Sequence, residues 1–341
     1  VGHPTMTGLC VTILIAFALI LLGRAEAIWP IRLLLLAPVG VEVVQVVPWW
    51  RAGLWLYALL VGAVAVAGAA VATMIGVRSP RLAMLFAPGL TAAVLLADQL
   101  AGAPLQIAGA FGDNPLVAGR FSGMGNIDFG LTMACVLLVA AVVADLQRSG
   151  RRAAVVAAIF VVVALAIDAL PVFGDDLGGA VSLLPAGALL VALAARVRVT
   201  AMRVVAVVVA ALAAGVGVAT LDYTRPASKQ THVGRFVGQV LHGDAWQVVH
   251  RKIDAVLASF DNPVVTAAVV VAVVVAIVLH RRYATPHSVA AAVLGVAVLA
   301  VLGSALNDSG VFVAAAAMLG LAPPVLAAAL DADREGDTGS S

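Results

Sequence analysis

The chain has 341 residues, of which 63% are hydrophobic and only 11% are charged. Soluble domains carry about 25% charged residues, so a water-soluble protein of this size could not cover so much apolar surface. Twenty Lys and Arg against eighteen Asp and Glu leave a net charge of +2, which gives no basis for binding nucleic acid. The composition excludes a soluble enzyme, a disordered chain and a disulfide-rich scaffold, and predicts a multi-pass protein of the plasma membrane.

Eleven apolar segments are long enough to cross a bilayer, which needs about 20 apolar residues per helix. They fit helices rather than barrel strands, because barrel strands alternate polar and apolar residues. The expected fold is therefore all-α: a polytopic transmembrane helical bundle over residues 1–330, followed by a disordered cytoplasmic tail over 331–341. The expected spans are 6–23, 28–47, 52–76, 82–98, 128–145, 153–170, 177–195, 204–221, 263–279, 289–304 and 311–330.

The basic residues predict how the bundle is oriented. Thirteen of the twenty Lys and Arg follow the first, third, fifth, seventh and ninth spans or lie in the tail. Short loops rich in Lys and Arg remain in the cytoplasm. Five of the other seven basic residues lie in one long segment after the eighth span, where the rule carries least weight. The N-terminus is therefore expected outside and the C-terminus inside.

The long segment 222–262 is expected to form an extracytoplasmic amphipathic helical hairpin. In its first helix, which Thr231 can cap, apolar residues recur with helical spacing along one face. The opposite face carries His232 and Arg235, which either face a buried site or meet the lipid headgroups. The second helix has Asp244 and Gln247 at capping-box spacing. Its apolar positions are Val249, Ile253, Val256, Leu257 and Phe260.

Segment 98–127 is long for a connector and carries four glycines between residues 112 and 125. Membranes tolerate such irregular backbone only where protein or water covers it. Arg120 within it could clamp an anion, because a guanidinium binds phosphate through two parallel hydrogen bonds. The alternative is that Arg120 pairs with Asp113 or Asp128 and pins the loop.

Acidic side chains cluster at the same expected face. Asp175 and Asp176 precede a Gly-Gly pair at the start of the seventh span, where they could hold a divalent cation or supply a base. The alternative is simple capping of the helix. Asn307 and Asp308 before the last span present the same choice. Glu42 and Asp168 lie within spans but near the outer end, where solvation explains them equally well.

Several motifs recur together, in this order, in one group of bacterial membrane proteins. They are Pro-Trp-Trp-Arg at 48–51, Val-Ala-Gly-Arg-Phe-Ser-Gly-Met-Gly-Asn at 117–126, Gly-Asp-Asp-Leu-Gly-Gly at 174–179, Arg-Pro at 225–226, Thr-His-Val-Gly-Arg-Phe at 231–236 and Asn-Asp-Ser-Gly at 307–310. The chain resembles the polytopic membrane region of proteins, mostly from high-GC Gram-positive bacteria, that often carry an extracytoplasmic domain similar to the alkaline-phosphatase/phosphodiesterase superfamily. The resemblance implies no activity for the membrane region, and no phosphatase metal site is carried over.

The first functional hypothesis is a cell-envelope protein with an extracytoplasmically open polar site for a lipid-linked or phosphate-bearing substrate, as a binder or a transferase. The alternatives are a transporter or lipid flippase, and a membrane anchor for a phosphatase-like partner. Enzyme activity, the cofactor and the metal remain open, a divalent cation being one option. The expected catalytic residues are Asp175, Asp176 and His232. The expected substrate-binding residues are Arg120, Asn126, Asp128, Arg225, Arg235, Asn307 and Asp308.

Overall fold

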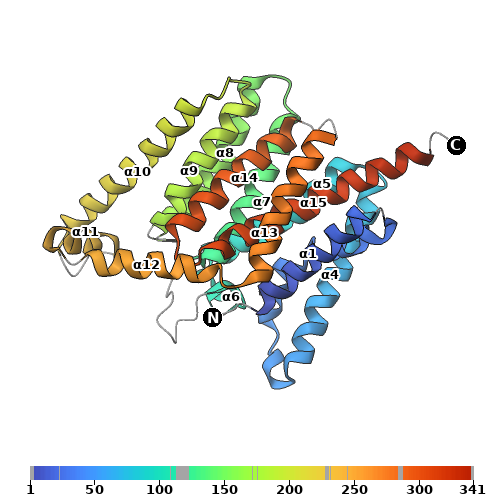
Figure 1. Cartoon of the computed structure of the whole chain (residues 1–341), viewed down its shortest axis with the longest axis horizontal. Coiled ribbons are helices and arrows are strands. Elements are labelled where there is room, and N and C mark those ends of the chain that lie inside the picture. The colour runs from blue at the N-terminus through green and yellow to red at the C-terminus, as the bar shows by residue number, and fades with distance from the viewer. Residues whose placement is uncertain are drawn as a thin grey trace.

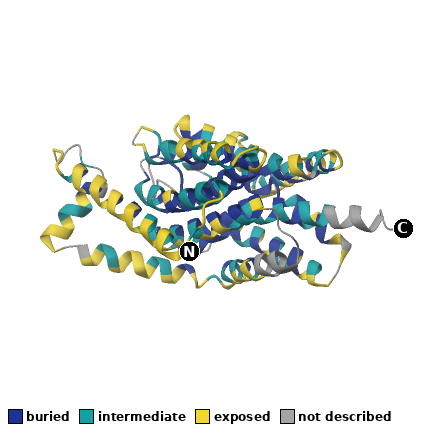
Figure 2. Ribbon diagram, turned by 90° about the horizontal axis from the view of Figure 1, so that it is seen from above, coloured by how far each residue is buried: buried dark blue, intermediate teal, exposed yellow. Residues whose placement is uncertain are grey.

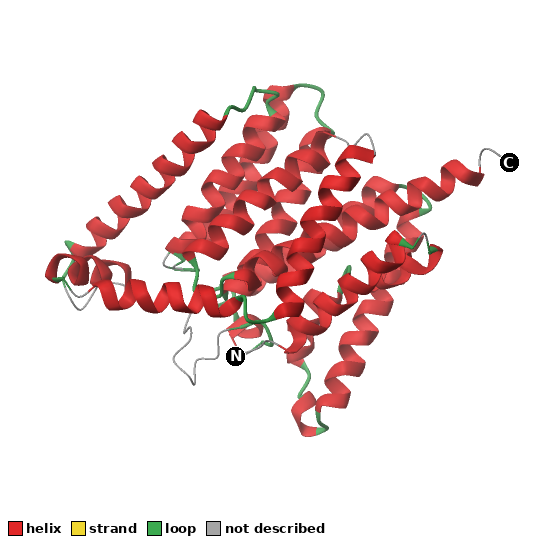
Figure 3. Ribbon diagram, in the orientation of Figure 1, coloured by secondary structure: helices red, strands yellow, loops and turns green. Residues whose placement is uncertain are grey.

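The computed structural model describes residues 4–22, 24–107, 109–112, 123–170, 172–174, 176–226, 230, 232–243, 245–282 and 287–338. Throughout these residues the regular structure is helical, without strands (Figure 3). Ten of the described helices are long and apolar enough to cross a membrane, or eleven if α12 and α13, which meet at 77°, count as one bent span. The predicted all-α polytopic bundle is confirmed, and the chain is a multi-pass membrane protein.

The long helices follow the apolar segments of the sequence closely, and Figure 1 shows their arrangement. Their bounds are α1 (Pro4–Leu21), α4 (Leu54–Gly76), α5 (Pro80–Leu100), α7 (Asn126–Asp145), α8 (Gly150–Ala169), α9 (Leu177–Ala194), α10 (Ala201–Tyr223), α13 (Pro263–Arg282), α14 (His287–Leu306) and α15 (Val311–Thr338). A short helix, α6 (Pro104–Ile107), follows α5.

The second span is broken rather than continuous. It consists of α2 (Ile28–Leu33), α3 (Ala37–Val43) and a final 3-10 turn at Val44–Val46. Pro38 stands in the first turn of α3. A proline has no N–H to donate and disfavours helical backbone in the residue before it, so the break falls where the sequence cannot continue an α-helix.

Helix α7 forms the centre of the bundle and packs against α5, α8, α14 and α15. Almost every residue of α7 is buried, including its polar residues. Glycines allow the close approach of α15: a Cβ on Gly130 would lie 2.5 Å from the Val313 carbonyl oxygen, and one on Gly320 would lie 2.8 Å from that of Leu131. Small residues at helix contacts are the usual means of close packing in lipid.

Helix α10 lies at the edge of the bundle and is attached along one narrow stripe. Only Ala211, Gly215, Ala219 and Asp222 of this helix are buried, and its other faces are exposed. Figure 2 shows these exposed faces beside the buried centre of the molecule. Because the exposed residues are mostly Val, Leu and Ala, α10 presents a surface suited to lipid on most of its sides.

The predicted amphipathic hairpin is present as α11 (His232–His242) and α12 (Ala245–Ser259). Gly243, between the two helices, has a positive φ of 85°. Trp246, Ile253 and Leu257 of α12 are exposed although apolar. Helix α11 thus packs on α10 at the edge of the molecule, and α12 runs from there back to the bundle with these three residues uncovered by protein (Figure 1).

Long-range contacts define two opposite faces of the bundle. The face that holds the start of α7, the end of α8, the start of α9 and the α14–α15 turn is called here the acidic face. The opposite face, called here the arginine face, holds the α7–α8 and α9–α10 loops, and Ser288 there bonds to Asp145. Its exposed arginines are Arg148, Arg151, Arg152, Arg196, Arg198 and Arg203. We still predict, from charge alone, that the arginine face is cytoplasmic.

Two expectations about charged positions differ from the structure. Arg32 is one of the thirteen basic residues assigned above to cytoplasmic loops or the tail. It lies inside α2 and is buried, with its guanidinium 2.8 Å from the Asp331 carboxylate of α15. The tail 331–341 was expected to be disordered, but α15 continues to Thr338. The ion pair gives a physical reason, because it fixes the first residue of that tail against α2.

Candidate functional site

Buried polar side chains concentrate at the acidic face of the described bundle. Carboxylates and amides lie at the ends of α3, α5, α7, α8, α9 and α14, where helices that are distant in sequence meet. Buried polar groups in lipid are costly, and they mark functional sites more often than exposed ones do. The group comprises Glu42, Asp98, Gln99, Gln106, Asn126, Asp128, Asp168, Asp176 and Asn307.

The first turn of α9 is the point where three of these side chains meet, and we call it the glycine contact (Gly178 and Gly179). Asp176 caps the helix by accepting the Gly179 N–H at 2.9 Å. A Cβ on Gly179 would lie 2.6 Å from Asp168 Oδ2 and 2.9 Å from Asp176 Oδ2, so both carboxylates face this glycine. A Cβ on Gly178 would lie 3.0 Å from Asn307 Oδ1. The Gly-Gly sequence therefore admits oxygen atoms from α8, α9 and α14 against one helical turn.

The loops above the glycine contact are held together by their backbones. The Asp176 N–H donates to the Asp168 carbonyl at 3.1 Å and closes the α8–α9 connection. Gly174 lies against that same carbonyl and the Gln99 amide, and a Cβ there would overlap both. Gly123, with a φ of 78°, lies directly against the Gly174 carbonyl oxygen. Two motifs separated by about fifty residues in the sequence thus form one surface.

A second contact ties the start of α7 to the α14–α15 turn. Asn126 Nδ2 donates to Asp308 Oδ1 at 3.0 Å and to Ser309 Oγ at 3.1 Å. Asn126 is buried, whereas Asp308 is exposed at the surface. Two of the predicted substrate-binding residues are therefore brought together across 182 positions.

Below this surface, polar atoms extend one or two turns into the bundle. Asp128 and Thr132 lie on consecutive turns of α7 and are fully buried. Among the described residues, the Asn307 Nδ2, Thr132 Oγ1 and Ser304 Oγ atoms have no hydrogen-bond partner. Buried polar atoms usually have a protein or water partner. Three such atoms on α7 and α14, two helices in contact, indicate that water or a ligand group completes this region.

Part of the buried polar group has a structural task. Asp98 accepts the backbone N–H groups of Leu105 and Gln106 at 3.1 and 3.2 Å, which fixes α6 beneath the end of α5. Glu42 accepts the Phe111 N–H at 3.1 Å and is fully buried. The solvated alternative for Glu42 is therefore wrong, because the segment after α6 covers it. The same alternative is wrong for Asp168, which is also fully buried.

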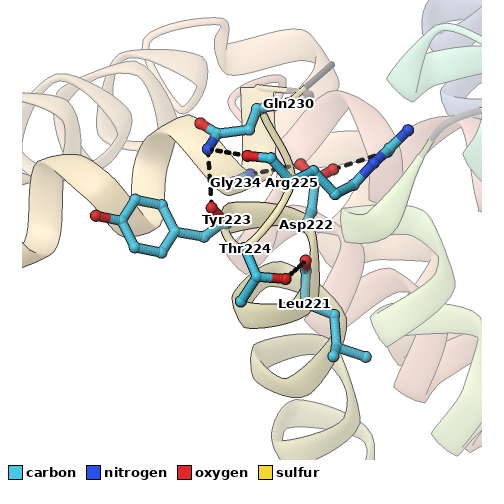
Figure 4. A network of polar contacts seen from close by, with 7 residues as sticks. All are labelled: Leu221, Asp222, Tyr223, Thr224, Arg225, Gln230 and Gly234. Carbon is cyan, nitrogen blue, oxygen red and sulfur yellow. Dashed lines mark hydrogen bonds and ion pairs between the residues drawn. The ribbon is translucent and has the colours of Figure 1, made fainter. Parts of the chain in front are cut away.

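Arg225 and Arg235 belong to a different place, the corner between α10 and α11. There Asp222 accepts Arg225 Nη1 at 3.0 Å and the Gly234 N–H at 3.0 Å, as Figure 4 shows. Gln230 Nε2 donates to the carbonyls of Tyr223 and Arg225 and closes the turn. Arg235 is exposed on α11. In Figure 1 this corner lies at the left edge of the molecule, where α10 diverges from α9.

Several predicted site residues lie outside the described part of the chain. They are Arg120, Asp175 and the side chain of His232. Their predicted roles remain predictions, including the anion clamp assigned to Arg120. Asp128, Asp176, Asn126, Asn307 and Asp308 do gather at the acidic face.

Sequence reasoning missed Asp98, Gln99 and Gln106 as members of the buried group. Asp98 and Gln99 stand at the predicted end of the fourth span, and Gln106 lies in the connector after it, where polar residues are normally taken as solvated. The long, half-apolar connector after this span could have indicated them, because such a segment packs on the bundle and buries the helix end below it.

Among the described residues, no group of three or more His, Cys, Asp or Glu side chains is placed to hold a metal ion. The glycine contact offers two carboxylates and one amide oxygen, which is a donor set for a hard cation that also keeps water ligands. Comparison with protein-family models, with curated proteins and with solved structures finds no match to the chain.

Proposed function

We propose that this chain is a cell-envelope protein of the plasma membrane whose acidic face binds a phosphate-bearing, lipid-linked substrate from the extracytoplasmic side. The observation that carries the proposal is the convergence at the glycine contact. Asp168, Asp176 and Asn307 come from three helices, and each reaches the first turn of α9. The helix ends at this face therefore place two carboxylates and one amide around a single helical turn, which one helix could not do alone.

The distribution of polarity along α7 favours a binding site over a passage. The buried polar residues of α7 are Asn126, Asp128 and Thr132, all in its first two turns. From Met133 to Ala144 the buried residues of this central helix are apolar. A transported ion or polar solute would need partners along the whole path. The polar part of α7 is therefore limited to its first two turns, which favours a site that is closed on this helix over a passage along it.

The surrounding elements suit a substrate with a lipid tail. Helix α12 runs from the α10–α11 corner towards the α14–α15 turn, where Ser259 Oγ accepts the Val311 N–H at 2.9 Å. Its exposed apolar residues suit the acyl region near the headgroups. A lipid-linked substrate could keep its tail in the bilayer while its polar part reaches the acidic face beside α12.

Two roles are open to the carboxylates of Asp168 and Asp176. They could hold a divalent cation against the substrate phosphate, or one of them could accept a proton from an attacking hydroxyl. The first role makes binding depend on the cation. The second makes turnover, rather than binding, depend on the carboxylate.

The test is binding of undecaprenyl phosphate to the purified full chain in nanodiscs, with and without EDTA in a magnesium buffer. We expect the wild type to bind this lipid, and Asp168→Asn or Asp176→Asn to weaken binding at least tenfold in the cation case. Asp176→Asn keeps the helix cap, since Asn caps about as well as Asp. Asp261→Asn is the matched control, because Asp261 is an exposed carboxylate in the turn after α12.

Each outcome bears on the proposal. Loss of binding in both variants and in EDTA supports a cation-bridged phosphate. Binding that survives in both variants, combined with loss of substrate turnover in cells that depend on the chain, supports the proton-accepting role. Unchanged binding and unchanged turnover in both variants, or no binding by the wild type, would overturn the assignment.

A further inference from the structure

The arginine face carries a cleft that the proposed function does not use. It lies between the ends of α7, α8, α9 and α14; the space that water can enter is about 30 Å³, and the volume is about 400 Å³ only when the open solvent at its mouth is included. Its rim includes Asp145, Arg196, His287 and Ser288. Its floor is made of small apolar residues, which leave space where four helices meet. These are Ala141, Ala144, Ala153, Ala194 and Ala291.

Arg196 occupies a backbone position that normally favours glycine. Its φ is 59°, in the left-handed region. The Val197 N–H bonds to the Ala192 carbonyl at 3.0 Å and the Arg196 N–H to that of Leu193 at 2.9 Å, which is the Schellman ending of a helix. Glycine is usual there because a Cβ makes this conformation unfavourable. The presence of an arginine indicates that its side chain serves a purpose at the rim of the cleft.

The rim presents both signs of charge, and they do not neutralise each other. Asp145 accepts the Ser288 hydroxyl at 3.3 Å. Neither Asp145 nor Arg196 forms an ion pair within the described part of the chain. His287 Nε2 lies 3.0 Å from the Leu193 carbonyl oxygen. Because a carbonyl only accepts, the Nε2–H group donates this hydrogen bond, which fixes the ring beside the cleft. A ligand that carries both a negative and a positive group matches this rim.

We propose that the cleft binds the headgroup of a phospholipid that has a phosphodiester and a primary ammonium, as phosphatidylethanolamine does. The Arg196 guanidinium would bind the phosphate through its planar fork, and Asp145 would accept from the ammonium. The cleft lies at the helix ends, which is the level of lipid headgroups. The acyl chains would stay in the bilayer around α8, whose outward face, turned away from Ala153 in the cleft, carries the exposed Val155, Ile159 and Val162.

The experiment measures lipid retention by the full chain using native mass spectrometry. The protein is reconstituted with equal amounts of phosphatidylethanolamine, phosphatidylcholine and phosphatidylglycerol of the same chain length. We expect at least fivefold preferential retention of phosphatidylethanolamine. Phosphatidylglycerol lacks the ammonium, and the trimethylated amine of phosphatidylcholine has no N–H to donate to Asp145. Soluble glycerophosphoethanolamine should compete at millimolar concentration, which separates headgroup recognition from contacts of the acyl chains.

Two substitutions test the assigned contacts without endangering the fold. Arg196→Gly places the preferred residue in the left-handed position, so we expect the melting temperature to stay the same or rise while lipid retention falls at least fivefold. Asp145→Asn keeps an acceptor for Ser288 but should abolish the preference for the primary ammonium. Arg148→Gln is the matched control, because Arg148 is exposed on the same face and does not line the cleft.

The proposal is overturned by any of three results. The first is an equal loss of retention in Arg148→Gln and Arg196→Gly, which would mean general surface attraction. The second is strongest retention of phosphatidylglycerol, which would mean that only negative charge is recognised. The third is failure of the soluble headgroup to compete. None of these results bears on the acidic face, so the proposed function stands or falls separately.

Discussion

At the scale of single residues, the glycine contact is sensitive to one methyl group. A Cβ on Gly179 would lie 2.8 Å from the Phe129 ring as well as against two carboxylates. We expect Gly179→Ala to destabilise the protein by about 1–3 kcal/mol, the usual range for overpacking, and to weaken substrate binding. Unfolding in increasing SDS measures the first effect.

The matched control for this substitution is Gly217→Ala in α10. A Cβ on Gly217 would meet nothing within 4 Å. Alanine favours helix more than glycine does, so this variant should be as stable as the wild type or slightly more stable. Equal behaviour of the two variants would show that the glycine contact has room to relax.

The ion pair between Arg32 and Asp331 provides a second test. Both side chains are largely buried, with 11% and 23% of their surface exposed. Removing one partner leaves the other charge buried alone, so Arg32→Ala or Asp331→Ala should each cost about 3 kcal/mol. The double variant Arg32→Met with Asp331→Leu should recover most of that loss. If the double variant loses as much stability in SDS unfolding as the two single variants combined, this expectation is wrong.

Residue partners are the part of the site that the sequence could not predict. Asn126, Asp176 and Asp308 lie at one face of the bundle, as expected from the charge pattern that assigned their loops to one side, and their roles in a site stay predictions. The bond between Asn126 and Asp308 could not be predicted, because spacing along one helix carries no information about a helix 182 residues away. Asp168 was left undecided for the same reason, since its burial depends on α9 and its loop.

At the scale of elements, α12 allows a direct test of how it lies in the bilayer. On a helical projection, Ile253 and Leu257 share one side, and Arg251 and Lys252 lie towards the other. We expect spin labels at 253 and 257 to be relaxed by oxygen, which dissolves in lipid, and labels at 251 and 252 by a water-soluble nickel complex. Electron paramagnetic resonance of the four single-cysteine variants measures this. Equal nickel access at all four positions would place α12 in water.

Element positions were the best predicted feature, because each span is set by local hydropathy. The hairpin was predicted from helical periodicity and caps, and α11 and α12 confirm it. The break between α2 and α3 was not predicted. It depends on Pro38 and on packing against α4, which hydropathy over a long window does not detect.

At the scale of the whole molecule, the charge pattern predicts which face is extracytoplasmic. The test uses Arg148→Cys and Asp261→Cys in a background where Cys10 and Cys135 are replaced by alanine. Both target positions are exposed, on opposite faces. A membrane-impermeant maleimide should label position 261 in intact cells and position 148 only after permeabilisation. The reverse pattern would invert the orientation and place the glycine contact in the cytoplasm.

The central position of α7 also constrains how the protein is assembled during synthesis. Its neighbours α14 and α15 follow the other described spans in chain order, and they supply much of the surface that buries α7. Until these two helices are inserted, the polar side chains of Asn126 and Asp128 are not fully covered by protein. A chain that stops after α13 would keep the contacts of α7 with α5, α8 and α9 but lose those with α14 and α15, so we expect it to be degraded faster than the full chain.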